Sequence, residues 1–204
     1  MTSMPRLLLA THNRGKLREL ADLLGDVPFE LVSLADAGID VDVEETGSTL
    51  EENAVLKAER YRDLSGMLTL ADDSGLEVDA LDGDPGVRSA RYAGPDATDS
   101  DRIRLLLSNL GHTPQSSRTA RFRCVIAIAA PDRQTRLYSG VCRGRIICKA
   151  RGDNGFGYDP VFLFPDLGLT MAELSPEQKN AVSHRALAVR KVATALMVEY
   201  ERRG

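Results

Sequence analysis

The sequence predicts an α/β protein with an elongated, mixed β-sheet flanked by helices. Apolar runs of strand length alternate with stretches whose apolar residues recur at helical spacing. Two long apolar runs near the middle of the chain are separated by a short turn, which indicates a central hairpin. Strands and helices mixed in this way are typical of a mixed sheet. No repeat or linker divides the 204 residues, so we expect one domain spanning 1–204.

Two strands and a helix are expected in the first 34 residues. Residues 7–10 form an apolar run before polar and glycine residues, as in a buried strand that enters a loop. Residues 30–34 form a second candidate strand. Between them, apolar residues at helical spacing precede a stop at Gly25: Leu17, Leu20, Ala21 and Leu24.

A second helix is expected from Thr49, because Thr49 and Glu52 form the capping box Thr-x-x-Glu. Its inner face carries residues spaced by three and four positions: Leu50, Ala54, Ala58 and Tyr61. Residues 67–71 then form a strand, which we expect to end in the Asp-Asp-Ser-Gly loop 72–75. Another short strand is expected near residues 77–81.

The second half of the chain begins with a loop at 82–95, which holds three glycines and two prolines. Thr98 and Asp101 start a helix that runs to about Asn109. Residues 120–130 and 134–142 are the expected hairpin strands, and 143–149 extend the second one.

A glycine-rich loop at 152–160 precedes the apolar residues 161–164. The chain ends in a predicted amphipathic helix, marked by apolar residues at helical spacing: Val189, Val192, Ala193, Leu196 and Tyr200.

Composition excludes several classes of protein. Apolar residues make up 43% of the chain, as in globular proteins, and none of its runs approaches the ~20 residues of a membrane helix. The apolar run near the N-terminus is too short for a signal peptide, so we expect a cytoplasmic protein. The net charge of −4 lacks the basic surplus of a general nucleic-acid binder. Three cysteines without CxxC spacing indicate buried or half-buried free thiols rather than disulfides or zinc ligands: Cys124, Cys142 and Cys148.

The first candidate site is Thr11-x-Asn13-x-x-Lys16, at a strand-to-helix junction. Backbone N–H groups at a helix N-terminus attract anions, and a lysine adds a full positive charge, so this segment suits a triphosphate. It lacks P-loop spacing, and a capped helix with a solvated lysine is the competing interpretation.

Two acidic clusters are candidates for a magnesium site: Glu44-Glu45-Thr46-Gly47 and Asp72-Asp73-Ser74-Gly75. Magnesium takes oxygen ligands, often one or two carboxylates together with substrate phosphates. Two acidic loops far apart in sequence can hold one ion between them, although a solvated acidic loop is the alternative. Asn53 and Lys57 lie one turn apart on the intervening helix, where Lys57 either reaches a phosphate or is solvated.

Two further clusters suit a nucleoside. In residues 155–160, glycines allow close backbone approach, Phe156 offers a stacking face and Asp159 can accept hydrogen bonds from base or ribose. A tight turn around a buried aromatic is the alternative. Lys179 with Ser183-His184-Arg185 is the last cluster, and His184 and Arg185 can donate to a base carbonyl. Three histidines in all give poor support for a histidine-built zinc site.

Together these clusters resemble the non-canonical purine nucleoside triphosphate pyrophosphatases, also called inosine/xanthosine triphosphate pyrophosphatases. The resemblance runs from about Leu7 to Ala188, and the order and spacing of its motifs make it specific. The stretches that carry it are 11–16, 44–47, 52–54 with 57–58, 71–76, 85–92, 155–160 and 183–185.

The resemblance implies an elongated α/β fold with two lobes, a central active-site cleft and a homodimer. It also implies Mg²⁺-dependent hydrolysis of ITP, dITP and XTP to the monophosphate and pyrophosphate, which cleanses the nucleotide pool. Glu44 and Asp73 would bind the metal, and Asp73 would accept the proton of the attacking water. Ser74 and Lys57 would contact substrate. The triphosphate would lie on Thr11, His12, Asn13, Arg14, Gly15 and Lys16. The nucleoside would lie among Phe156, Gly157, Tyr158, Asp159, Lys179, His184 and Arg185.

Three other functions remain open on the sequence alone. One is a related pyrophosphatase for pyrimidine or other modified nucleotides. Another is a nucleotide-binding regulator without turnover. The third, a general nucleic-acid binder, is disfavoured by the acidic balance, and we expect neither nucleic acid nor membrane as a partner.

Overall fold

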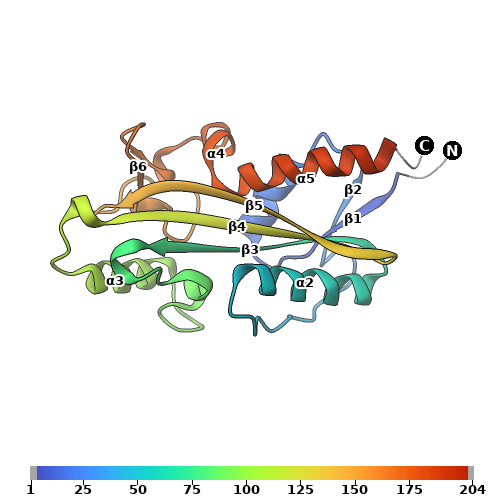
Figure 1. The fold of residues 1–204 in the computed structure, drawn as a ribbon, viewed down its shortest axis with the longest axis horizontal. Helices are drawn as coiled ribbons and strands as arrows, with labels where there is room; N and C mark the ends of the chain where they lie inside the picture. Colours follow the sequence, from blue (N-terminus) through green and yellow to red (C-terminus); the bar gives the residue numbers. More distant parts are fainter. Residues whose placement is uncertain (1–3, 202–204) are drawn as a thin grey trace. The chain divides into compact units, whose positions relative to one another are not determined.

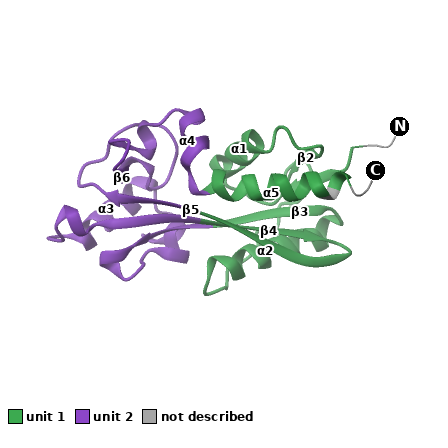
Figure 2. Ribbon diagram, turned by 45° about the horizontal axis from the view of Figure 1, so that its top comes forward, with its two compact units in different colours: residues 1–73, 124–140, 185–204 green, residues 74–123, 141–184 purple. Residues whose placement is uncertain are grey.

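The structure is a computed structural model that describes residues 4–201. The chain divides into two compact units (Figure 2). Unit 1 comprises Met1–Asp73, Cys124–Gly140 and Arg185–Gly204, and unit 2 comprises Ser74–Arg123 and Val141–His184.

Seven strands hydrogen-bond in the order β2-β1-β3-β4-β5-β6-β7. They are β1 (Arg6–Leu9), β2 (Glu30–Ser33), β3 (Leu68–Val78), β4 (Thr119–Ala130), β5 (Arg133–Ile146), β6 (Phe162–Phe164) and β7 (Leu169–Thr170). β1 pairs in parallel with β2 and β3, whereas β6 pairs antiparallel with β5 and β7. The predicted mixed sheet flanked by helices is therefore confirmed, including the central hairpin β4–β5.

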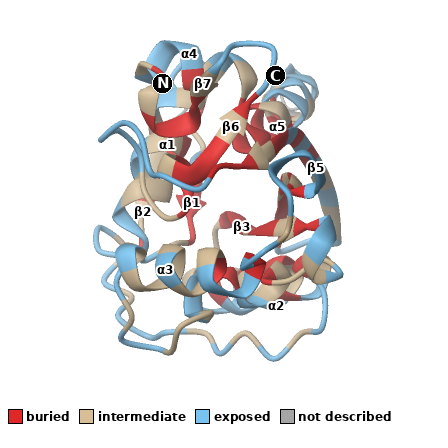
Figure 3. Cartoon of the chain, turned by 90° about the vertical axis from the view of Figure 1, so that its left-hand side faces the viewer, coloured by how far each residue is buried: buried red, intermediate tan, exposed pale blue. Residues whose placement is uncertain are grey.

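Unit 1 surrounds its part of the sheet with α1 (Arg14–Leu23), α2 (Leu50–Ser65) and most of α5 (His184–Glu201). Figure 1 shows α2 and α5 on opposite faces of the strands. On the face covered by α1 and α5, every second residue of the strands packs against apolar residues of these helices and forms the core. Its fully buried members include Leu7, Leu70, Ile126, Leu20, Val192 and Leu196. The strands β1 and β3 are buried over nearly their whole lengths (Figure 3).

Unit 2 contains α3 (Asp99–Leu110) and α4 (Pro176–Val182) beside the remaining parts of β3, β4 and β5. Its own core includes Leu76, Leu106, Ile146, Phe162 and Met171. The loop predicted at 82–95 contains a 3₁₀ turn, Gly86–Arg91. Another 3₁₀ turn, Asp159–Val161, immediately precedes β6.

The helix starts follow the predicted capping residues. Thr98 and Asp101 form a complete capping box at α3. At α2, the Thr49 side chain accepts from the Glu52 N–H, but the Glu52 carboxylate accepts from Ser48 instead of closing the box. The box predicted there is therefore half formed, because the Ser48 hydroxyl and N–H compete for that carboxylate.

The main correction concerns β3. The sequence predicts a strand that stops at residue 71, a loop at 72–75 and a new strand near 77–81. The structure has one continuous strand, Leu68–Val78, followed by a 3₁₀ turn at Asp79–Leu81. Aspartates are common in turns, which is why the sequence predicts a loop at Asp72 and Asp73. The strand continues because lysines elsewhere in unit 1 pair with both buried carboxylates.

No helix within residues 4–201 is long and apolar enough to cross a membrane. The cysteines carry no disulfide: Cys124 and Cys142 are buried as predicted, whereas Cys148 is exposed.

We expect Leu70→Ala to destabilise the protein by about 2–5 kcal/mol, because Leu70 is 0% exposed in the core between β3 and the helices α1 and α5. The matched control is Leu64→Ala on α2, where the side chain is 41% exposed and the change should stay within about 0.5 kcal/mol. Urea unfolding followed by circular dichroism measures both, and equal losses would contradict the assignment of this core.

Candidate active site

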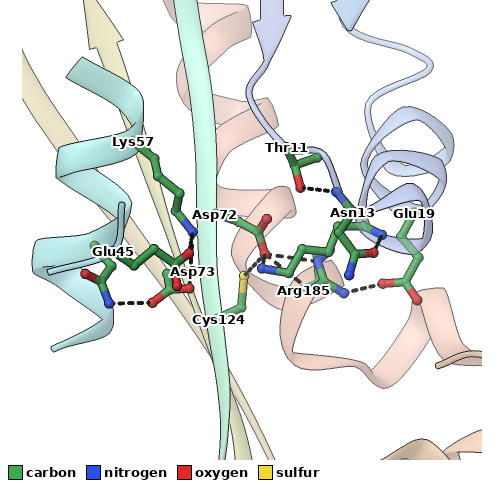
Figure 4. Close-up of polar contacts among 11 residues, drawn as sticks. Thr11, Asn13, Glu19, Glu45, Lys57, Asp72, Asp73, Cys124 and Arg185 are labelled. Atoms are coloured by element: carbon green, nitrogen blue, oxygen red, sulfur yellow. Dashed lines mark hydrogen bonds and ion pairs between the residues drawn. The ribbon is translucent and has the colours of Figure 1, made fainter. Parts of the chain in front are cut away.

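The two aspartates of β3 lie on opposite faces of the sheet. Side chains alternate along a strand, so neighbouring residues point in opposite directions. Asp72 is 1% exposed and Asp73 is 5% exposed, so both carboxylates need partners. Figure 4 shows Asp73 turned toward Lys57 and Glu45, and Asp72 turned toward Arg185. All of these residues belong to unit 1.

On one face, the Lys57 ammonium joins two carboxylates. Its Nζ lies 3.2 Å from Asp73 Oδ1 and 2.6 Å from Glu45 Oε1. Asn53, one turn earlier on α2, donates from Nδ2 to Asp73 Oδ2 at 3.3 Å. The Asn53 Oδ1 accepts from the Gly47 N–H at 2.7 Å. Asn53 and Lys57 therefore connect the acidic segment 44–47 to Asp73, and they do so from the helix face that their spacing predicts they share.

The pKa values reflect this crowding. Burial raises the pKa of Asp73, and the positive charges of Lys57 and Lys16 only partly oppose that effect. Burial lowers the pKa of Lys57, but attraction to Asp73 and Glu45 outweighs it and leaves that pKa raised. A carboxylate whose pKa is raised is a stronger base and therefore a better proton acceptor.

The acidic pair 44–45 is divided between two environments. Glu45 is half-buried and pairs with Lys57, whereas Glu44 is exposed. The predicted site residue was Glu44, and its role as a metal ligand stays a prediction. Sequence alone gave no reason to single out Glu45, because adjacent acids in an irregular segment carry no periodicity that separates them.

The donor set on this face fits a magnesium ion in chemistry. Asp73 and Glu45 carry hard carboxylate oxygens here, and magnesium commonly completes its shell with water and substrate phosphates. Among residues 4–201, no group of three or more histidine, cysteine, aspartate or glutamate side chains is assembled for metal binding. This arrangement suits a metal ion whose ligands are a few carboxylates and the phosphates of a bound nucleotide.

On the other face, two cations share the Asp72 carboxylate. The Lys16 Nζ lies 3.1 Å from Asp72 Oδ2, and the Arg185 Nη2 lies 3.2 Å from the same oxygen. Arg185 is only 1% exposed, and its Nη1 also pairs with Glu19 of α1. The Cys124 Sγ lies 3.9 Å from Asp72 Oδ2. Asp72 thus connects α1 and α5 to β3.

This geometry changes the expectation for Arg185. The sequence predicted it beside a nucleoside, whereas the structure places its guanidinium against Asp72 and Glu19 inside unit 1. A direct contact of Arg185 with a base stays a prediction. Glu19 was missed, because a glutamate in a helix is usually on the surface and nothing in its spacing marks it.

Residues 11–16, which are predicted to bind the triphosphate, form the N-terminus of α1 and the residues just before it. Asn13 is the N-cap, and its Oδ1 accepts from the Lys16 N–H at 3.0 Å. The Thr11 Oγ1 accepts from the Asn13 N–H at 3.2 Å. The His12 ring lies against the Val41 carbonyl, with 3.2 Å between Nε2 and the oxygen. Arg14 and Gly15 lie in the first helical turn, whose N–H groups favour an anion.

The residues predicted to surround a nucleoside assemble within unit 2 around Asp159. Asp159 Oδ2 accepts from the Phe156 N–H at 3.0 Å and from Lys179 Nζ at 2.6 Å. The Lys179 ammonium lies 5.0 Å from the centroid of the Phe156 ring. Gly155 has φ +78°, and a Cβ there would lie 2.1 Å from Asp159 Oδ2, so only glycine fits.

Two other residues of this loop are engaged within unit 2. The Tyr158 hydroxyl donates to the Ser89 carbonyl at 3.0 Å, and burial raises the Tyr158 pKa. The Gly157 N–H donates to Asp99 Oδ2 at 2.7 Å. Ser74, the remaining predicted contact, is half-buried in β3. These bonds shape the loop, and the contacts with a nucleoside stay predictions.

The fold and these clusters define an α/β protein in which Lys16, at a helix N-terminus suited to phosphate, pairs with a buried carboxylate of the central strand β3. The model of the Ham1 family matches residues 7–195. The dITP/XTP pyrophosphatase of Geobacter sulfurreducens is 52% identical over 91% of this chain and 94% of its own. That of Bacillus subtilis is 44% identical over 96% and 99%. The chain belongs to the Ham1 family.

Solved structures agree with this membership. A HAM1 protein from Coxiella burnetii superposes with a TM-score of 0.87 at 44% identity, covering 95% of this chain and 98% of that one. The Ham1 protein of Staphylococcus aureus gives a TM-score of 0.85 at 43% identity, covering 95% and 99%.

We expect Asp72→Asn to destabilise the protein by about 3 kcal/mol or more, because the buried Arg185 and the half-buried Lys16 lose the charge that they share. The control is Asp132→Asn, which breaks an exposed ion pair with Arg133 and should change stability by less than about 1 kcal/mol. Urea unfolding compares the variants, and equal midpoints would show that the Asp72 network adds nothing to stability.

Proposed function

We propose that this protein hydrolyses non-canonical purine nucleoside triphosphates, namely ITP, dITP and XTP, to the monophosphate and pyrophosphate. Relatives named dITP/XTP pyrophosphatase, 44–52% identical over more than nine tenths of the chain, support this activity. The observation that carries the chemistry is the buried centre of Asp73, Lys57 and Glu45 in the same unit as the α1 N-terminus. The reaction would remove noncanonical nucleotides from the pool.

In the proposed mechanism, a water attacks the α-phosphorus as the bond to the β-phosphate oxygen breaks, and pyrophosphate leaves in line. Asp73 accepts the proton of that water, which its raised pKa favours. Residues 11–16 hold the triphosphate, with the Lys16 ammonium and the N–H groups of Arg14 and Gly15 as donors, and Lys57 adds positive charge near the developing negative charge. A bound Mg²⁺ would neutralise phosphate charge.

We assign recognition of the nucleoside to the unit 2 cluster. Phe156 offers a face for the base, and Gly157, Tyr158, Asp159, Lys179 and His184 frame it, with Ser74 as a further contact. A contact of Arg185 with the carbonyl of the base is also part of this proposal. Discrimination against ATP requires a donor that pairs with a 6-carbonyl and clashes with a 6-amino group.

We also propose that the protein acts as a cytoplasmic homodimer, as the family resemblance implies. Size-exclusion chromatography with light scattering tests the dimer, and a mass of one 22.2 kDa chain at micromolar concentration would refute it. Fractionation of cells that express the native chain tests the location.

The experiment that tests the activity follows both products in ¹⁸O-labelled water with Mg²⁺. Substrates are ITP, dITP, XTP, ATP and GTP. We expect pyrophosphate rather than orthophosphate, the label in the monophosphate, and higher kcat/KM for the three noncanonical substrates. Orthophosphate as product, or no preference over ATP and GTP, refutes the proposal. Preference for a pyrimidine or another modified nucleotide in a wider panel would favour the related pyrophosphatase.

We expect Asp73→Asn to lower kcat by about 10²–10⁴-fold while the fold survives, because the amide cannot accept the proton of the attacking water. Asp63→Asn, which removes an exposed acid of α2, is the control and should retain activity. Pyrophosphate release and circular dichroism measure the two effects. A nucleotide-binding regulator would bind triphosphate without turnover, and Asp73→Asn would leave its function unchanged.

Chelation should abolish turnover, and added Mg²⁺ should restore it. We assign the second metal ligand to Glu44, as the family resemblance implies, and treat Glu45, which pairs with Lys57, as the alternative. Glu44→Gln should then raise the Mg²⁺ concentration for half-maximal activity by about tenfold, whereas Glu45→Gln should change it less. Magnesium titrations of both variants decide the assignment, and the reverse order would transfer the ligand role to Glu45.

A further inference from the structure

His184 is held in unit 2 by two neighbours to which no role has been given. The Phe122 ring stacks on the imidazole, with centroids 4.8 Å apart and planes 12° from parallel. The Cys142 Sγ lies 3.9 Å from the Nδ1 atom. His184 is 4% exposed, Cys142 6% and Phe122 7%, so the three side chains form one buried group.

Phe122 is itself fixed by further aromatic packing. Its ring lies 4.7 Å from that of Phe162, which in turn meets Phe164 edge-on at 5.3 Å. A ring stacked on an immobile ring has little freedom to rotate about χ2. Phe122 therefore fixes the plane of the imidazole, and within that plane Nδ1 lies on the side of Cys142.

Cys142 carries a hydrogen that Nδ1 can accept. Burial raises the pKa of Cys142 to about 12, so the group is a thiol at physiological pH. Backbone hydrogen bonds from His184 and Phe122 to the sulfur oppose that shift only in part. A sulfur that accepts backbone N–H groups directs its own S–H toward another acceptor, and Nδ1 is 3.9 Å away.

The tautomer of a neutral histidine decides what its second nitrogen can do. If Nδ1 accepts from the thiol, the ring hydrogen resides on Nε2, which then donates. An Nε2–H can donate a hydrogen bond to a purine 6-carbonyl. It cannot form one with a 6-amino group, because both groups are donors. A bare Nε2 would favour the amino group instead.

We propose that Cys142, with the ring held by Phe122, sets His184 in the Nε2–H tautomer and thereby selects purines with a 6-carbonyl over those with a 6-amino group. Cys142 and Phe122 are positioning residues, since they act through His184. This inference rests on the proposed function in one respect, namely that His184 faces the base.

The tautomer is measured directly by ¹⁵N NMR of protein labelled at histidine. The chain has only three histidines, so removing His12 and His112 in turn assigns the third. We expect a pyridine-like Nδ1 and a protonated Nε2 in the wild-type protein and in Cys142→Ser, whose hydroxyl also donates. Cys142→Ala should shift the pattern toward a mixture. A protonated Nδ1 in the wild-type protein overturns the proposal.

Kinetics test the consequence. Cys142→Ala should lower the ratio of kcat/KM for ITP to that for ATP by about tenfold, the effect of one hydrogen bond, and Cys142→Ser should restore it. Cys148→Ala, which removes an exposed thiol, is the control and should keep the ratio. A Cys142→Ala protein with the wild-type ratio and tautomer overturns the proposal. If Cys142→Ala does not fold, the wild-type and Cys142→Ser spectra still decide the tautomer.

The two proposals fail in different ways. If the wild-type protein releases no pyrophosphate from ITP, the proposed function is wrong, whatever the NMR spectra show. If it prefers ITP but His184 carries its hydrogen on Nδ1, the activity stands and the role of Cys142 is wrong.

Discussion

Asp72 and Asp73 are buried neighbours on β3, and each is paired with cations on its own face of the sheet. A buried carboxylate without a partner costs several kcal/mol, so the strand can carry two of them only if both faces supply positive charge. Lys57 meets Asp73, while Lys16 and Arg185 meet Asp72. These contacts connect β3 to α1, α2 and α5, so the same ion pairs that stabilise unit 1 also place its candidate catalytic groups.

The apolar residues of β3 set which aspartate faces which helix. Leu68 and Leu70 belong to the core shared with α1 and α5, and Asp72 has the same parity along the strand. Thr69 and Ala71 have the same parity as Asp73 and point to the other face, where Asp73 meets Lys57 of α2. A slip of one residue would exchange the faces of the two acids and bury the leucines on the wrong side. Hydrophobic burial therefore fixes the orientation of the charged groups.

Local rules predicted those parts of the site that depend on local geometry. The Asn13 segment at the start of α1 and the shared face of Asn53 and Lys57 follow from capping and helical spacing. The continuation of β3 through Asp72 and Asp73 was not predictable, because its cause is charge supplied by distant parts of the chain. The same limit applies to Glu19, whose partner Arg185 lies 166 residues away.

The charges of the unit 1 cluster give an independent argument for a divalent cation. Its named members are four carboxylates, Glu19, Glu45, Asp72 and Asp73, and three cations, Lys16, Lys57 and Arg185. This set carries one negative charge more than it has positive charges before any ligand arrives, and Arg185 and Lys16 already pair with Asp72. A triphosphate would add several negative charges to a site that is not positive. The α1 N-terminus offsets only about half a charge. Binding a triphosphate at this centre therefore requires positive charge beyond that of the cluster, which is the contribution of Mg²⁺ in the proposed reaction.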